Sequence, residues 1–427
     1  MLTLRCSGDW RRLWAAIALV VAQALILSLA TGPSPLRAET TLAKDARIGG
    51  DAERTRFVAD LSKKVSFRVF TLADPYRVIV DMPDVRFQMP AGLGRKGKGL
   101  VTAYRYGLIA QGKSRIVIDV KAPVLVDKAF VLEARDGNPV RLVIDLAKTD
   151  RTKFLAILAK QPGPDATAKK SKVASVPLPA AAPPALRKRR GGQSKPIVVI
   201  DPGHGGVDPG AISRSGLKEK DVVFDFAKML RNEIAKRGRL RPIMTREIDV
   251  YVPLRERVAL ARRNGASLFI SIHADSVPGR FSRKASGATV YTLSERASDS
   301  EARTLAAKEN RSDIIAGVEL PSESDEVTNI LIDLAQRETK NLSITFAGTL
   351  LSGLKGETPL RKKSHRFAGF RVLKAPDVPS VLVELGYISN PNDAKRLKSR
   401  EWRKEMAVTI SRAVESYFSK RLARVPF

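Results

Sequence analysis

Two histidines and two glutamates lie in stretches of the chain that could perform hydrolytic chemistry. They are His204, Glu219, His273 and Glu384. Imidazole and carboxylate groups bind zinc in proteins and also move protons during hydrolysis. The chain has 427 residues but only three histidines and one cysteine, so zinc modules built from several cysteines are excluded. A metal site in this chain is therefore expected to recruit carboxylates beside its histidines.

The elements predicted around these residues are alternating strands and helices. Short apolar runs at 196–200, 268–272 and 380–385 are typical of buried parallel strands. Helices are predicted between them, because apolar residues recur at four-residue spacing over 222–234 and a second helical pattern covers 254–263. This alternation predicts an α/β domain, in which a twisted, mostly parallel sheet is flanked by helices.

Functional residues of such sheets gather beyond the carboxyl ends of the strands. His204 follows the first predicted strand, His273 ends the second, and Glu384 lies near the end of the third. Glu219 opens the helix after the glycine-rich loop that contains His204. A catalytic zinc takes three protein ligands and a water, and two histidines with one glutamate are an established set. The remaining carboxylate could accept the proton of that water and pass it to a leaving amine.

Each of these residues could instead have a structural role. His204 could belong to a tight turn, and His273 could be a hydrogen-bonded residue at the end of a strand. Glu219 could complement the positive amino end of its helix, and Glu384 costs free energy in an apolar strand unless it is paired or functional. The convergence of all four favours a zinc site. The third histidine, His365, lies among basic residues and is expected to be solvated or at a substrate edge rather than a ligand.

The first third of the chain contains an internal repeat. Four copies share an arginine, three mostly apolar residues, an aspartate and an apolar residue, at 56–61, 77–82, 115–120 and 141–146. Such β-branched runs between turn residues predict strands. The repeat therefore predicts a small all-β sandwich over 45–150. Its arginines and aspartates are expected to pair across strands on one face, although that face could instead bind a ligand.

The N-terminus has the pattern of an export signal. Arginines precede an apolar run at 13–30, and cleavage is predicted after Ala38, so 1–38 is expected to be a signal peptide. The pair Arg11-Arg12 before the run permits a twin-arginine route, and an uncleaved membrane anchor is the alternative. Export would place the protein in the periplasm.

A basic segment separates the two predicted domains. Residues 151–194 are rich in proline, alanine and basic side chains, which predicts a linker without a packed core. The net charge of +31 indicates anionic partners. The run at 187–190 could bind nucleic acid, but for an exported protein we expect no nucleic acid and instead adhesion to the anionic surface of the envelope.

Six stretches of the C-terminal half resemble the catalytic domain of the zinc-dependent N-acetylmuramoyl-L-alanine amidases of the bacterial cell-division type. They are Ile200-Asp-Pro-Gly-His-Gly-Gly-Val-Asp-Pro-Gly-Ala211, Leu217-Lys-Glu-Lys-Asp-Val222, Thr245-Arg246, Ser271-Ile-His-Ala-Asp275, Phe370-Arg-Val-Leu-Lys374 and Pro379-Ser-Val-Leu-Val-Glu-Leu-Gly-Tyr-Ile-Ser-Asn390. On this resemblance, 195–421 is the catalytic domain. Residues 45–150 are similar to the amidase-associated β-sandwich that targets such enzymes to the envelope or septum.

The resemblance implies that His204, Glu219 and His273 hold zinc and that Glu384 is the catalytic carboxylate. It implies cleavage of the amide bond between N-acetylmuramic acid and L-alanine of the peptidoglycan stem peptide, in cell-wall remodelling and daughter-cell separation. A non-catalytic envelope-binding protein is an alternative, against which the four intact site residues weigh. A zinc deacetylase or endopeptidase on the same polymer is another, which only the family motifs oppose.

A long charged excursion at 295–340 lies between a predicted strand and a helix expected to begin near Asn341. Long insertions beside a site are often lids or regulatory elements. In amidases of the division type, a helix inserted here resembles a plug that a protein activator of the LytM-like type displaces. The resemblance makes Glu309 the expected plugging carboxylate, with Glu319 as the second choice. A surface helix without that role is the alternative.

Overall fold

The computed structural model describes most of the chain from residue 40 onward. The described residues are 40–90, 92–135, 137–160, 195–277, 285–318 and 330–423. The predicted signal peptide and most of the predicted linker lie outside them. The described residues after Thr40 belong to one compact unit. Among them, no helix has the length and apolarity that crossing a membrane requires.

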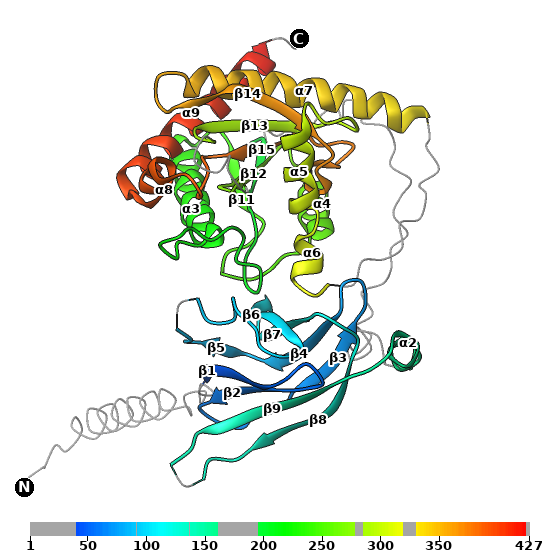
Figure 1. The fold of residues 1–427 in the computed structure, drawn as a ribbon. Helices are drawn as coiled ribbons and strands as arrows, with labels where there is room; N and C mark the ends of the chain where they lie inside the picture. Colours follow the sequence, from blue (N-terminus) through cyan, green and yellow to red (C-terminus); the bar gives the residue numbers. More distant parts are fainter. Residues whose placement is uncertain are drawn as a thin grey trace, which may run out of the picture. The chain divides into compact units, whose positions relative to one another are not determined.

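Two sheets form the predicted β-sandwich (Figure 1). The five-stranded sheet has the order β5-β1-β2-β9-β8 and the four-stranded sheet the order β3-β4-β7-β6. Their strands are β1 (Thr41–Gly50), β2 (Arg54–Leu61), β3 (Arg68–Leu72), β4 (Arg77–Pro83), β5 (Val85–Phe87), β6 (Val101–Ala110), β7 (Lys113–Val120), β8 (Val124–Leu132) and β9 (Val140–Lys148). Every second side chain of the central strands enters a shared apolar core that includes Phe57, Val78, Ile118 and Ile144. The prediction of a small all-β sandwich is confirmed.

The four copies of the repeat form the central strand pair of each sheet. Arg56 of β2 lies opposite Asp145 of β9, and its guanidinium donates two hydrogen bonds of 2.6 and 2.8 Å to that carboxylate. Arg115 of β7 lies opposite Asp81 of β4 and makes the same two-fold contact, also at 2.6 and 2.8 Å. The expected pairing of arginine and aspartate across strands is confirmed at both places.

The first residues of the predicted linker form a helix, α2 (Arg151–Leu158). Asp150 caps it by accepting a hydrogen bond of 2.8 Å from the backbone N–H of Lys153. Phe154 is buried, and its ring centroid lies 5.1 Å from that of Tyr76. Ordered structure therefore continues past the predicted start of the linker at 151, because one aromatic side chain anchors this helix on the sandwich.

The C-terminal domain is built on one six-stranded sheet with the order β11-β10-β12-β15-β13-β14. All neighbouring strands are parallel except β13 and β15. The elements are β10 (Ile197–Pro202), α3 (Glu219–Arg237), β11 (Arg241–Met244), α4 (Leu254–Arg263), β12 (Leu268–His273), β13 (Ala288–Leu293), α5 (Ser300–Glu309), α6 (Ser312–Ile315), α7 (Ile330–Leu354), β14 (Leu360–Ala368), η2 (Arg371–Leu373), β15 (Ser380–Glu384), α8 (Pro391–Lys398) and α9 (Arg400–Ala423). The predicted twisted, mostly parallel sheet is confirmed.

Helices cover both faces of this sheet (Figure 1). One face packs against α3, α7 and α9 through a core that includes Phe226, Phe346 and Ile410. The other packs against α4, α5 and η2 through residues such as Ala261 and Leu305. The carboxyl ends of β10, β12 and β15 are neighbours in the sheet, so the residues that follow them are brought together.

The predicted insertion at 295–340 contains α5, α6 and the beginning of α7. α7 begins at Ile330, earlier than the start expected near Asn341. The physical reason is composition, since leucine, alanine, glutamine, arginine, glutamate and lysine between these positions all favour helix. Glu319, the second choice for the plugging carboxylate, lies outside the described residues.

Candidate metal centre

His204 is positioned by the glycine-rich loop that follows β10. Its φ of 58° lies in the left-handed region, and both following glycines also have positive φ. Its carbonyl oxygen accepts a hydrogen bond of 2.8 Å from Arg257 of α4. Its Nδ1 lies 2.8 Å from the carboxylate of Asp208, within the same loop. With Nδ1 paired to this carboxylate, Nε2 is the ring nitrogen available to a metal.

A buried ion pair supports the loop. Nη1 of Arg257 lies 3.0 Å from Oδ1 of Asp201, and neither side chain is more than 1% exposed. The Asp201 carboxylate also accepts hydrogen bonds from the hydroxyls of Thr245, at 2.6 Å, and Ser271, at 2.8 Å. Burial raises the pKa of Asp201, but Arg257 and the two hydroxyls outweigh burial and lower it. This network ties β10, β11 and β12 to the backbone of His204.

Glu219 and His273 come from two further elements. Glu219 is the first residue of α3, and its carboxylate accepts hydrogen bonds from the backbone N–H groups of Ala211, at 2.8 Å, and Ala274, at 2.9 Å. His273 is the last residue of β12, with Nδ1 3.2 Å from Oε1 of Glu219. Burial raises the pKa of Glu219, but the two imidazoles outweigh it and hold that pKa well below its ordinary value.

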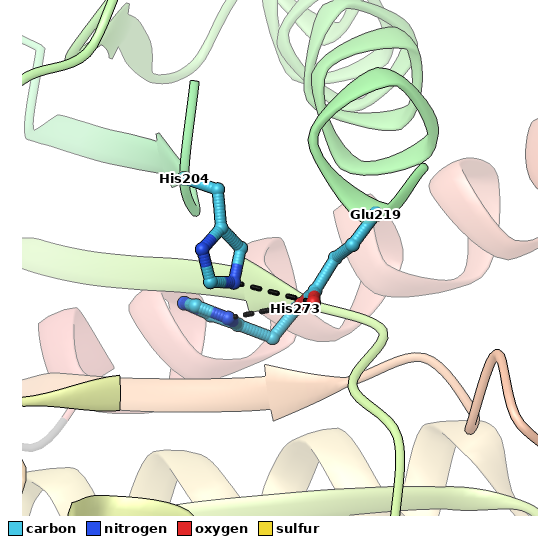
Figure 2. A group of neighbouring side chains, drawn as sticks. All are labelled: His204, Glu219 and His273. Carbon is cyan, nitrogen blue, oxygen red and sulfur yellow. Dashed lines mark hydrogen bonds and ion pairs between the residues drawn. The ribbon is translucent and has the colours of Figure 1, made fainter. Parts of the chain in front are cut away.

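Figure 2 shows the three side chains pointing at one another. One ligand atom from each lies within 4.8 Å of the others. The two imidazole rings have centroids 5.0 Å apart and planes at 76°. Burial lowers the pKa of His204, but the surrounding carboxylates, Glu219 first, outweigh burial and raise that pKa well above its ordinary value. The donor atoms of the three residues therefore face a common point from three directions.

The donor set fits zinc. Two ring nitrogens and one carboxylate oxygen are an established ligand combination for this ion. Nε2 of His204 is buried and makes no hydrogen bond, although Oε2 of Glu219 lies 3.2 Å away. The cluster also needs glycine beside it: a Cβ at Gly203 would lie 2.4 Å from the His273 ring, and one at Gly210 would lie 2.6 Å from the His204 ring.

Glu384 lies beside the cluster as the last residue of β15. It is in register with His273 on the neighbouring strand and is fully buried. Its Oε2 accepts a hydrogen bond of 2.9 Å from the backbone N–H of Asp275, and its Oε1 has no hydrogen-bond partner. Burial raises the pKa of Glu384 well above its ordinary value. One oxygen is thus fixed and the other is available, which suits a group that accepts and then donates a proton.

Glu309 enters the same cluster from the last residue of α5. Its Oε2 lies 3.3 Å from Nε2 of His204 and 3.3 Å from Nδ1 of His273, and the residue is 4% exposed. The cavity lined by these residues has a volume of about 10 Å³. That volume holds at most about one water molecule, so the space beside the two imidazoles is almost filled while Glu309 is in this position.

The four residues predicted to act together are thus brought together. His365 is not among them: it lies on β14, with Nε2 3.1 Å from the hydroxyl of Thr292. Sequence reasoning assigned no role to Asp208, Asp201 or Arg257, which orient His204. One signal was available for Arg257, because it falls on the buried side of an amphipathic helix, where an unpaired charge is costly.

A parallel α/β sheet that presents two imidazoles and a carboxylate at one edge, with a second carboxylate beside them, is typical of metal-dependent hydrolases. Comparison with known proteins identifies the family. Residues 198–416 match the family model described as N-acetylmuramoyl-L-alanine amidase, and 45–146 match the AMIN domain. The chain belongs to the N-acetylmuramoyl-L-alanine amidase family and carries an N-terminal AMIN domain.

Its relatives include two amidases of Escherichia coli. The chain is 34% identical to N-acetylmuramoyl-L-alanine amidase AmiC over 384 residues. This alignment covers 87% of this chain and 88% of AmiC. It is 41% identical over 243 residues to N-acetylmuramoyl-L-alanine amidase AmiA, covering 55% of this chain and 83% of that protein. The solved structure of the amidase AmiC2 of Nostoc punctiforme matches 53% of this chain and 99% of that chain, with 30% identity and a TM-score of 0.38.

Proposed function

We propose that this protein is a zinc-dependent hydrolase that cleaves the amide bond between N-acetylmuramic acid and L-alanine in peptidoglycan. The observation that carries the proposal is the buried cluster of His204, Glu219 and His273 with the free carboxylate oxygen of Glu384 beside it. The family and the names of its relatives supply the substrate and the bond. The AMIN match supports a periplasmic, envelope-associated location and a role in cell-wall remodelling.

The residues divide the work by their positions. His204 binds through Nε2, because Nδ1 donates its hydrogen to Asp208. Glu219 binds as a carboxylate held ionised by two backbone N–H groups and two imidazoles. Zinc held by these residues would supply a Lewis acid that polarises the amide carbonyl and lowers the pKa of a water molecule. Glu384 accepts that water's proton at Oε1 and donates a proton to the leaving L-alanine nitrogen.

Zinc content tests the ligand assignment. The purified mature protein is expected to hold one zinc per chain, and His204→Ala is expected to lose it, since a three-ligand site cannot spare a ligand. His365→Ala is the matched control, because this histidine lies on β14 outside the cluster. Elemental analysis of the three proteins gives the answer. A wild-type protein without bound zinc, or equal loss in His365→Ala, would contradict the assignment and favour a non-catalytic envelope-binding protein.

We further propose that α5 autoinhibits the enzyme through Glu309. Its carboxylate lies within 3.3 Å of both imidazoles, where a fourth zinc ligand would stand in place of water. Two contacts hold the helix there: Lys308 pairs with Asp275, and Glu301 pairs with Arg361 of β14. Activity then requires the Glu309 carboxylate to leave the cluster, and a protein activator of the LytM-like type is the proposed partner that displaces α5 and this carboxylate with it.

A further inference from the structure

Three arginines on the outer face of the four-stranded sheet have a use beyond pairing with aspartates. They come from three neighbouring strands: Arg77 from β4, Arg105 from β6 and Arg115 from β7. Their guanidinium groups converge on the backbone of 314–317, at the carboxyl end of α6. Arg105 donates to the carbonyl of Ile315 at 2.6 Å, Arg115 to that of Gly317 at 2.7 Å, and Arg77 to that of Ile314.

Hydrogen bonds to aspartates orient two of the three guanidinium groups. Arg105 is held by two hydrogen bonds to Asp119, at 2.5 and 3.0 Å, and Arg115 by its two bonds to Asp81. Each guanidinium has donors left over, and these reach the carbonyls. Carbonyls in the last turn of a helix have no donor within the helix, so the two sets of groups satisfy one another.

With 314–317 in contact, two of the three arginines are shielded from solvent, and the side chain of the third, Arg105, is 20% exposed. Arg77 is 4% exposed and Arg115 is 6% exposed. Burial, followed by repulsion from Arg105, lowers the pKa of Arg77 to about 10. A buried cation needs hydrogen-bond acceptors, and the carbonyl groups of 314–317 supply acceptors to these arginines.

Apolar contacts complete the fit. Ile79 and Val117, on the same face of the sheet as the arginines, belong to one buried cluster with Ala316. Gly317 has a φ of 67°, and a Cβ there would lie 2.7 Å from the Ile79 side chain and 3.3 Å from that of Val117. The segment therefore approaches the sheet more closely than a larger residue at 317 would allow.

The arginine-bound residues 314–317 follow Glu309 of the metal centre closely in the sequence. Glu309 ends α5, and α6 follows after two residues. Within α6, the Asp313 carboxylate accepts hydrogen bonds from the hydroxyl of Tyr251, at 2.8 Å, and from the backbone N–H of Leu254, at 3.0 Å. Residues 309–317 thus form one short, anchored span, with a plugging carboxylate at its start and the arginine-bound carbonyls at its end.

We infer that the arginine face of the AMIN domain is a binding site for 314–317 of the same chain, and that this contact holds Glu309 in the metal centre. The inference rests on the proposed blocking role of Glu309. It gives the β-sandwich a second task besides targeting: its departure from 314–317 releases one end of the inhibitory segment.

Hydrogen–deuterium exchange of the full-length mature protein tests this inference without relying on activity. Arg77→Gln and Arg105→Gln, on different strands, each remove one charged donor to the segment. Backbone amides of 309–318 are expected to exchange about tenfold faster in each variant, since a hydrogen bond from a charged group contributes that much to closing. Arg56→Gln is the matched control, because its guanidinium makes the same two-fold contact with Asp145 in the other sheet and is exposed.

Two outcomes are decisive. Faster exchange at 309–318 in both variants, with strands 77–83 and 113–120 still protected and Arg56→Gln unchanged, supports the inference. Unchanged exchange at 309–318 in the variants whose strands remain protected overturns it. Hydrolysis by Glu309→Ala reports separately on the blocking role, so a failure of that role and a failure of the arginine contact give different results.

Discussion

Glu384→Gln is expected to stop the release of peptides from purified sacculi while leaving zinc bound. The amide has nearly the shape of the carboxylate and can still accept the backbone N–H of Asp275. It cannot accept the proton of water or return one to the leaving nitrogen. General acid–base catalysis of this kind contributes about 10²- to 10⁴-fold to rates, so peptide release should fall by at least that factor. Peptide release and zinc content are measured on the same preparation.

A comparison with His204→Ala separates proton transfer from metal binding. His204→Ala should lose both zinc and turnover, whereas Glu384→Gln should lose turnover alone. Glu384 lies in register with His273 and has one oxygen without a hydrogen-bond partner. As a proton acceptor beside the metal rather than a ligand, it can be replaced without loss of zinc. Unchanged peptide release by Glu384→Gln would sink the assignment of Glu384 as the catalytic carboxylate.

Glu309→Ala is expected to raise the basal rate of peptide release about 5- to 150-fold, the usual range for a regulatory coupling of 1–3 kcal/mol. The alanine removes the carboxylate that lies 3.3 Å from each imidazole and leaves α5 in place. The substitution is a sharper test than deleting 300–335. Such a deletion would also remove Ala302, Leu305 and Ala306 from the apolar core of the domain.

The control for this prediction is Arg303→Ala, an exposed position on the same helix. It should leave the basal rate unchanged. A rate for Glu309→Ala no higher than that of the wild type, in a protein that still binds zinc and remains folded, would show that α5 is a surface helix without an inhibitory role.

The convergence of the four site residues could be predicted because it depends on local patterns and one topological rule. Apolar runs predict β10, β12 and β15, and parallel strands carry their functional residues at the same edge. His273 and Glu384 then become neighbours in the register of the sheet. That arginines and aspartates of the repeat pair across strands could also be predicted, because residues four positions apart in a strand lie on the same face. Arg56 and Asp145 are one such pair.

Long-range contacts could not be predicted in the same way. The Asp201–Arg257 ion pair joins elements far apart in the sequence, and neither residue has a spacing that reveals the other. Arg77 and Arg105 donate hydrogen bonds to the carbonyl groups of residues 314 and 315, which lie 237 and 210 positions away in the sequence. Every residue has a backbone carbonyl, so the sequence does not indicate which carbonyls accept these hydrogen bonds.

Mass spectrometry of the fragments released from purified sacculi tests the central claim most directly. Cleavage by the wild-type protein is expected to release stem peptides that begin with a free L-alanine amino group, and to leave glycan strands with a free lactyl carboxyl on N-acetylmuramic acid. Glu384→Gln should release neither product. Peptides cut within the stem, or glycans that have lost only acetyl groups, would instead show an endopeptidase or a deacetylase and contradict the account.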